Sequence, residues 1–123
     1  MTGKEAGAVE IGVAYHRAWT NGDLDSAAEH LAESVTCHAP SGTFNGRAAV
    51  RAFMEPFAAS LTSSRLLAVH GQDNEAILMY DTASRAVQSA PGAELYRVQD
   101  GQIVEIHIIF DRLPFALARG DVR

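Results

Sequence analysis

The sequence predicts an α+β domain in which a curved antiparallel sheet wraps around helices from the first half of the chain. The first half carries apolar residues at helical spacing, beginning with Ile11, Tyr15 and Trp19. The last third alternates apolar and mixed positions at spacing two, from Val104 to Phe110, which is typical of a half-buried strand. Helices that precede a run of strands, without alternating with them, indicate the α+β class.

Three helices are predicted in the first half. The first spans residues 5–20 and ends at Asn21-Gly22, because glycine accepts the left-handed conformation that stops a helix. Asp23 can cap a second, short helix that includes Leu24. The third helix starts at Asn45-Gly46 and contains Pro56, where we expect a kink because proline donates no backbone hydrogen bond. Its apolar stripe comprises Val50, Phe53, Met54, Phe57 and Leu61.

Strands are predicted for residues 35–39, 65–70 and 75–84, and for the two runs that flank Gln99-Asp100-Gly101. Pro40-Ser41-Gly42 is expected to form a turn, and residues 85–92, rich in small side chains, a loop. A strongly twisted sheet that curls around the third helix would leave a concave mouth. Concave apolar mouths are where small ligands bind.

The last hairpin allows two registers. A two-residue Asp-Gly loop would place Glu94 opposite His107, whereas a three-residue loop would place it opposite Ile106. A shift of one residue exchanges the two faces of a strand. We prefer the three-residue loop because it puts Tyr96 and Val98 on the apolar face of the last strand. Glu94 then points inward, and replacing this costly buried carboxyl by leucine is expected to stabilise the fold or leave it unharmed.

Composition narrows the classes of function. The chain has 123 residues, enough for one domain over residues 1–123, and a formal net charge of −5, so nucleic acid is not an expected partner. No segment reaches the roughly 18 apolar residues of a membrane span, and we expect a soluble cytoplasmic protein. A single cysteine, Cys37, excludes an internal disulfide. We expect no metal site, because no histidine pair lies four residues apart beside a carboxylate and HExxH is absent.

Three stretches of the chain carry a resemblance to a known family. They are Tyr15-x3-Trp19-x-NGDLD, PSGTFNGRAAVRAF and AELYRVQDGQIVEIHIIFD-x2-PF. Together they resemble the SnoaL-like group of the nuclear transport factor 2-like superfamily over nearly the whole chain. The resemblance implies a cone-shaped α+β barrel with a deep pocket, commonly a dimer through the outer face of the sheet. The superfamily includes polyketide cyclases, ketosteroid isomerases, limonene-epoxide-type hydrolases and non-enzymatic binding or dimerisation domains, so the fold does not fix the function.

The resemblance also implies site residues, one position at a time. Tyr15 is similar in position to the tyrosine of the isomerases, and Glu94 to the protonated acid that is their second oxyanion donor. The isomerase base is replaced here by Ala39, and the last-strand aspartate of the cyclases and hydrolases by Ile108. Asp81 is similar in position to an aspartate of the hydrolases. Each of the sites known in the superfamily is therefore incomplete in this chain.

Four residues are candidates for catalysis, and each has a structural alternative. Tyr15 could polarise a carbonyl or epoxide oxygen, or it could be a core tyrosine with one hydrogen bond. Asp81 and Glu94 could be an acid/base pair whose pKa values are raised in an apolar cavity, or could lie in water at strand ends. His38 is next to Ala39, where the base is missing, and its imidazole could take the proton-transfer role, although strict alternation along the strand would point it the other way.

The predicted function is that of a small cofactor-independent enzyme that moves protons on an apolar oxygenated small molecule, by cyclisation, isomerisation or epoxide opening. The alternative is a non-catalytic ligand-binding or dimerisation module of the same fold. We expect a homodimer, because the outward face that carries Glu105, His107 and Ile109 exposes apolar area. The side chains expected to bind substrate are Trp19, Phe53, Phe57, Met79, Tyr96, Ile106 and Ile108.

Overall fold

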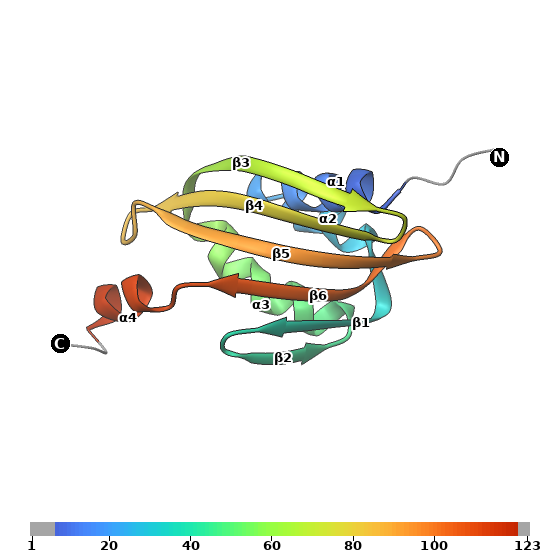
Figure 1. The fold of residues 1–123 in the computed structure, drawn as a ribbon. Coiled ribbons are helices and arrows are strands. Elements are labelled where there is room, and N and C mark those ends of the chain that lie inside the picture. Colours follow the sequence, from blue (N-terminus) through green and yellow to red (C-terminus); the bar gives the residue numbers. More distant parts are fainter. Residues whose placement is uncertain (1–6, 121–123) are drawn as a thin grey trace.

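The computed structural model describes residues 7–120 and consists of a curved six-stranded sheet with helices against one face (Figure 1). The helices are α1 (Ala8–Thr20), α2 (Leu24–Glu29), α3 (Arg47–Ser60) and α4 (Leu113–Arg119). The strands are β1 (Leu31–Ala39), β2 (Gly42–Asn45), β3 (Leu61–Gln72), β4 (Glu75–Ser84), β5 (Ala90–Gln99) and β6 (Gln102–Phe110). The predicted α+β class is confirmed.

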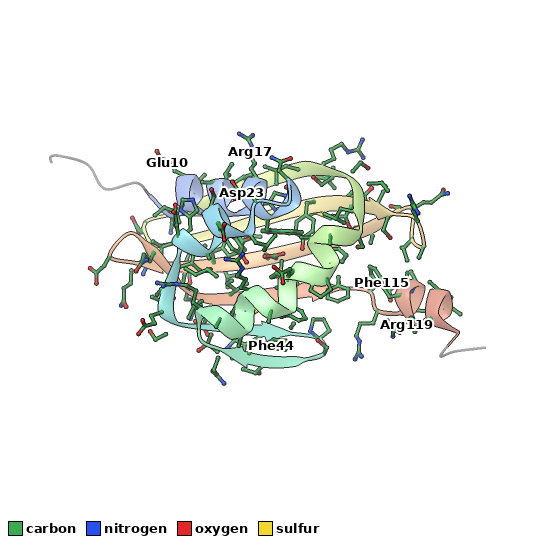
Figure 2. The ribbon with its side chains drawn as sticks, turned by 180° about the vertical axis from the view of Figure 1, so that it is seen from behind. Glu10, Arg17, Asp23, Phe44, Phe115 and Arg119 are labelled. Atoms are coloured by element: carbon green, nitrogen blue, oxygen red, sulfur yellow. The ribbon has the colours of Figure 1, made fainter. Side chains whose placement is uncertain are left out.

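The strands lie in the order β2-β1-β6-β5-β4-β3, and every neighbouring pair is antiparallel except β1 and β6. Short hairpins join the antiparallel neighbours from β3 to β6, whereas β1 and β6 meet only after the chain has passed through α3 and the other strands. Viewed from behind, α1, α2 and α3 cover one face of the sheet (Figure 2). We call this the inner face and the opposite one the outer face. None of the described helices is long and apolar enough to span a membrane.

The helix boundaries follow the local signals in the sequence. The helix α1 begins at Ala8, and residues 5 and 6 of the predicted helix lie outside the described part of the chain. At its end, Gly22 has a positive φ of 83°, which suits glycine. The Asp23 side chain then caps α2 by accepting a hydrogen bond from the Ser26 backbone N–H at 3.1 Å. The helix α3 runs through Pro56, and the bend there stays a prediction.

Several elements differ from the sequence prediction. The strand β5 starts at Ala90, inside the predicted loop of residues 85–92. The strand β1 starts at Leu31 rather than at residue 35, and β3 starts at Leu61, which the helical pattern had included in the third helix. The short strand β2 and the helix α4 were not predicted. Both are short: β2 has 4 residues and α4 has 7, with no side-chain hydrogen bond at its N-cap. Elements of this length give almost no periodic signal.

The hairpin between β5 and β6 has a two-residue loop. Asp100 and Gly101 both have positive φ, 52° and 78°, as a two-residue hairpin turn requires. Consequently Gln99 pairs with Gln102, and the preference for a three-residue loop is wrong. Both loops place Gly101 at a positive φ, which glycine tolerates, so the sequence alone does not separate them.

A bulge next to this turn restores the predicted orientation of Glu94. Between Arg97 and Val98 the register shifts by one residue, which places Glu94 opposite Ile108 rather than opposite Ile106 or His107. The shift by one residue exchanges the faces of the strand a second time, and the two changes cancel. Glu94 therefore faces inward and is only 1% exposed.

Candidate functional site

A pocket of about 250 Å³ lies between α3 and the inner face of the sheet, at the end where β6 leads into α4. Its wall is mainly apolar and aromatic. Figure 2 shows α4, with Phe115 and Arg119, at this end of the molecule. The ring of Phe115 contacts Phe57 of α3 and Phe110 of β6, with centroids 6.0 and 5.7 Å apart. The lining residues are Ser41, Phe53, Met54, Phe57, Tyr80, Ala90, Gly92, Glu94, Ile108, Phe110, Arg112, Phe115 and Arg119.

Glu94 is the acidic group of this pocket. Two tyrosine hydroxyls hold its carboxyl from opposite sides: Tyr80 Oη donates to Oε2 at 2.5 Å and Tyr96 Oη donates to Oε1 at 2.7 Å. Tyr80 lines the pocket together with Glu94, whereas Tyr96 is fully buried behind it. Among the described lining residues Glu94 is the only carboxyl group.

Burial dominates the electrostatics of this group. Removal from water raises the pKa of Glu94 above its ordinary value, and the hydrogen bonds from Tyr80 and Tyr96 offset only part of that rise. Burial and the nearby Glu94 also raise the pKa of Tyr80 and of Tyr96, so both phenols stay protonated. A buried carboxyl whose pKa is raised, and which two hydroxyl donors hold in place, holds its proton more readily than an exposed one and is a candidate for proton transfer.

A glycine makes room for the contact between Tyr80 and Glu94. Gly92 on β5 pairs with Tyr80 on β4. A Cβ atom at Gly92 would lie 3.1 Å from Tyr80 Oη and 3.2 Å from Cζ, closer than nearly all such contacts. Because this side chain is absent, the Tyr80 ring can lie over β5 and reach the carboxyl two residues further along that strand.

Several predicted site residues form a second layer behind the pocket wall. Tyr15 is buried on α1, and its ring meets the Tyr96 ring edge-on at 5.5 Å. Burial, followed by the charge of Glu94, raises the pKa of Tyr15. Trp19 is also buried and contacts Phe57 and Tyr80, with centroids 5.9 Å apart in both pairs. Neither Tyr15, Trp19 nor Tyr96 is among the lining residues, and the same holds for the buried Ile106 of β6.

Three predicted site residues lie away from the pocket. Met79 and Asp81 alternate along β4 with Leu78, Tyr80 and Thr82, whose side chains are buried under the helices. Met79 is therefore on the outer face and 48% exposed, and Asp81 accepts hydrogen bonds from the Ser89 hydroxyl and the Ala90 backbone N–H. The structure does not bring Asp81 together with Glu94, so the predicted acid/base pair is not formed.

His38 is also on the outer face. It alternates along β1 with the buried Cys37, and its side chain contacts Glu105 on β6. Side-chain alternation along β1 therefore points His38 away from the pocket, as the strict alternation of the strand had indicated. Of the predicted residues, Phe53, Phe57, Glu94 and Ile108 are the ones that line the pocket.

Sequence reasoning did not select Tyr80 or the C-terminal residues of the pocket. Tyr80 shares its side of β4 with Leu78, and this alternation was the available signal, but Ile77 and Met79 made the opposite face equally apolar. Phe110 belongs to the predicted inward row of β6, although it was not assigned to the site. Phe115 and Arg112 reach the pocket through α4, whose position no local pattern indicates.

Comparisons with known proteins give a matching family model and similar solved structures. The model of a SnoaL-like domain matches residues 13–106. A crystal structure of a protein from Kribbella flavida DSM 17836 is 48% identical, with a TM-score of 0.90, and the match covers 93% of this chain and 94% of that one. No curated protein matches the chain.

Two more distant structures share the fold. A candidate polyketide cyclase from Sinorhizobium meliloti is 16% identical with a TM-score of 0.72, covering 81% of this chain and 94% of that one. A candidate isomerase from Bacillus subtilis is 17% identical with a TM-score of 0.77, covering 94% of both chains. At these identities the likeness concerns the fold alone.

Proposed function

This chain belongs to the SnoaL-like domain family, and from that premise we propose that it is a cofactor-independent enzyme whose Glu94 moves protons on an apolar oxygenated small molecule. The observation that carries the proposal is the position of Glu94, a buried carboxyl that also lines the pocket. A buried carboxyl is costly to keep in an apolar wall, and chemistry is the common reason for keeping one.

The pocket favours reactions that need one acid/base group. The ionised Glu94 carboxylate would remove a proton from a carbon beside a ligand carbonyl, which leaves an enolate. The same carboxyl, now protonated, would return the proton to another carbon, which completes an isomerisation. In a cyclisation the enolate carbon attacks a second carbonyl, and the proton goes to the oxygen formed there. Epoxide opening has less support, because it needs both an acid for the epoxide oxygen and a base for water.

The tyrosines would act as positioning residues in this scheme. Tyr80 and Tyr96 hold both oxygens of Glu94, so the carboxyl has a defined direction relative to the pocket. The aromatic wall formed by Phe53, Phe57 and Phe115 suits a flat, apolar ligand body. Exposed Arg112 lies at the same pocket and would favour ligands whose outer end is acidic or strongly polar.

A non-catalytic binding module is the second candidate, and one observation favours it. Both oxygens of Glu94 already accept hydrogen bonds from protein groups, as expected of a structural polar residue. In that case Glu94 would shape the inner end of a ligand pocket without exchanging a proton with the ligand.

Deuterium incorporation separates the two candidates. Enones, β-polyketones and terpene ketones that shift the melting temperature would be incubated with the protein in D₂O and followed by mass spectrometry. We expect the wild type to exchange a carbon-bound proton of a bound ligand for deuterium. In Glu94→Gln this exchange should be slower by a factor of at least about 10². Phe53→Leu is the matched control, because it changes the apolar wall and keeps the carboxyl.

Three results of these exchange and binding measurements would contradict or limit the role proposed for Glu94. Ligands that bind the wild type without exchanging deuterium would favour the binding module. Equal exchange rates in the wild type and in Glu94→Gln would remove Glu94 from the chemistry. Loss of ligand binding in Phe53→Leu with retained binding in Glu94→Gln would assign the affinity to the apolar wall.

We also propose that the chain forms a homodimer through the outer face. Ile77, Met79 and Ile109 are 51%, 48% and 71% exposed there, on strands β4 and β6. Neighbouring positions bring them together, since Met79 pairs with Ala93 and Ala93 pairs with Ile109. An apolar row of this kind is commonly covered by a partner.

Sedimentation at micromolar concentration tests the dimer. We expect a dimer for the wild type and a shift toward monomer for Ile109→Lys, because the lysine would bury a charge in the interface. Leu117→Lys is the control, since Leu117 is a similarly exposed leucine on α4. A wild type that sediments as a monomer, or an Ile109→Lys protein that stays dimeric, would contradict this interface.

A further inference from the structure

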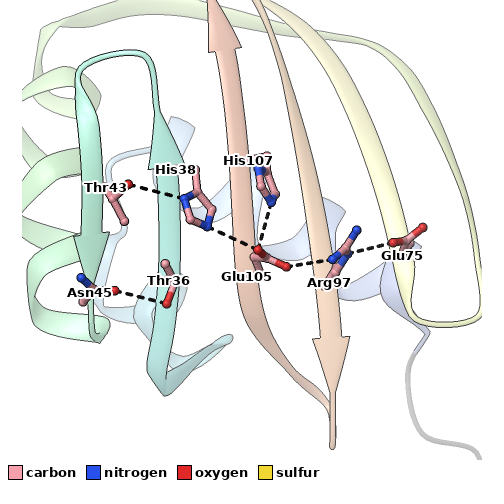
Figure 3. A network of polar contacts seen from close by, with 8 residues as sticks. All are labelled: Thr36, His38, Thr43, Asn45, Glu75, Arg97, Glu105 and His107. Carbon is pink, nitrogen blue, oxygen red and sulfur yellow. Dashed lines mark hydrogen bonds and ion pairs between the residues drawn. The ribbon is translucent and has the colours of Figure 1, made fainter.

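A second group of chemically active side chains lies on the outer face, where β1 and β6 run side by side (Figure 3). His38 on β1 and His107 on β6 are direct partners in the parallel register. Glu105 precedes His107 by two residues, so it points to the same face of β6. Three potential metal ligands are thereby placed on one patch of sheet, away from the pocket.

The three ligand atoms are close enough to share one ion. Glu105 Oε2 lies 3.3 Å from His38 Nε2 and 3.0 Å from His107 Nε2. One ligand atom from each residue lies within 4.8 Å of the other two. Ligand atoms around a tetrahedral zinc ion with bonds of about 2.0–2.1 Å are about 3.3 Å apart. The two imidazole rings stack with centroids 4.5 Å apart, and both lie beside the same carboxylate oxygen.

Neighbouring residues orient the ligands as an outer coordination shell would. Arg97 Nη1 holds Glu105 Oε1 at 3.1 Å, which leaves Oε2 to face the histidines. Arg97 is itself held by Glu75 at 2.9 Å. Thr43 Oγ1 lies 3.5 Å from His38 Nδ1, so the other ring nitrogen of His38 is the one that faces Glu105. Contacts of this kind fix ring orientation and raise ligand basicity in metal sites.

The charges around the cluster favour a cation. Glu75 and Glu105 carry two negative charges and Arg97 one positive charge, so the network is net negative when the histidines are neutral. Both imidazoles direct Nε2 at the same carboxylate oxygen, an arrangement that a bound cation would stabilise. In the single chain the side chains of His38, Glu105 and His107 are 41%, 28% and 41% exposed, so the fold of one chain does not enclose them.

We propose that His38, Glu105 and His107 form a binding site for a divalent first-row transition metal ion, with zinc as the reference ion. Two imidazoles and one carboxylate are a donor set that suits zinc and its neighbours in the series, and they disfavour magnesium and calcium, which require mostly oxygen ligands. Three protein ligands leave the remaining coordination positions to water or to an incoming ligand. The site is independent of the function proposed for the pocket.

Isothermal titration of the untagged protein with Zn²⁺ at pH 7.5 tests the site. We expect one ion per chain, and loss of binding by about 100-fold or more in His38→Ala and in His107→Ala. Thr43→Val should weaken binding by about tenfold, because outer contacts of metal ligands typically contribute this much. His70→Ala is the matched control, since His70 is an exposed histidine of β3, and it should bind like the wild type.

A spectroscopic measurement keeps the test independent of affinity. Titration of ¹⁵N-histidine-labelled protein with Zn²⁺ should shift the Nε2 resonances of His38 and His107 and leave those of His70 in place. The proposal is overturned if the wild type binds no zinc, if His38→Ala and His107→Ala bind it as the wild type does, or if His70→Ala alone removes binding. Circular dichroism of each variant shows whether the sheet is intact.

Discussion

Replacing Glu94 by leucine is expected to lower the free energy of unfolding by about 2–6 kcal/mol. The carboxyl accepts hydrogen bonds from two tyrosine hydroxyls, and leucine would leave both without this acceptor. A buried polar group that loses its partner costs about 1–3 kcal/mol. This reverses the expectation from sequence, which treated Glu94 as an isolated buried acid whose removal would not harm the fold. Only the structure shows the two tyrosine partners, and because of them the substitution is now expected to destabilise the fold.

Glu94→Gln is the matched variant for this prediction. It keeps the shape and one acceptor oxygen, and the hydroxyl that faces its amide can rotate to accept a hydrogen bond. We therefore expect a loss of about 1 kcal/mol, the typical net value of one hydrogen bond. Urea denaturation of the three proteins at one pH measures the difference. A Glu94→Leu protein as stable as the wild type would show that the tyrosines find other partners, and would contradict the structural role of the carboxyl.

The pH dependence of the same variants gives a second readout. The folded-state pKa of Glu94 is raised, so above the unfolded value of 4.5 the unfolded chain has released a proton that the folded chain keeps. Stability from this group therefore falls as pH rises from about 4.5 to the folded-state pKa. Glu94→Gln cannot titrate, and this fall should be absent from its stability curve.

His16 is expected to make the fold sensitive to acid. It lies under the sheet between Trp19 and Tyr80, with ring centroids 5.2 and 4.7 Å away, and it is only 2% exposed. Burial, followed by the charge of Arg17, lowers its pKa from 6.5 to about 4. The unfolded chain takes up a proton as pH falls below 6.5, whereas the folded chain does so only near pH 4. Stability is therefore lost across this window, by about 3 kcal/mol.

The comparison of wild type with His16→Phe isolates this effect. Phenylalanine keeps an aromatic ring against Trp19 and Tyr80 and does not titrate. We expect the loss of stability between pH 6.5 and 4 to shrink in the variant by up to about 3 kcal/mol, whatever its stability at pH 7. His70→Phe, at an exposed histidine, should keep the wild-type slope. Equal slopes in all three proteins would show that burial does not lower the pKa of His16 in the folded state.

The class of fold, the family and most helices and strands could be predicted from the residues alone. Local signals were sufficient for these, because an apolar stripe, a capping aspartate and a glycine with positive φ act within a few residues of one another. The Asp23 cap and the strand β4, predicted as residues 75–84, are examples. The inward direction of Glu94 was also predicted, because the neighbouring Tyr96 and Val98 required an apolar face.

Which residues come into contact depends on how the strands and helices pack together. A two-residue turn and a bulge together set the register of β5 on β6, and neither can be read from the residues of one strand. The side of β4 that faces the helices selected Tyr80 for the pocket and placed Asp81 and Met79 outside it.

The cluster of His38, Glu105 and His107 on the outer face could not be predicted from the sequence for the same reason. His38 and His107 become partners only because β1 and β6, far apart in the chain, pair in parallel, and a search for metal motifs within one segment could not find them. Side-chain alternation along a strand is local, but its phase relative to the core is fixed by packing against distant elements. For this reason the sequence predicted the elements, whereas the composition of both sites depended on the assembled sheet.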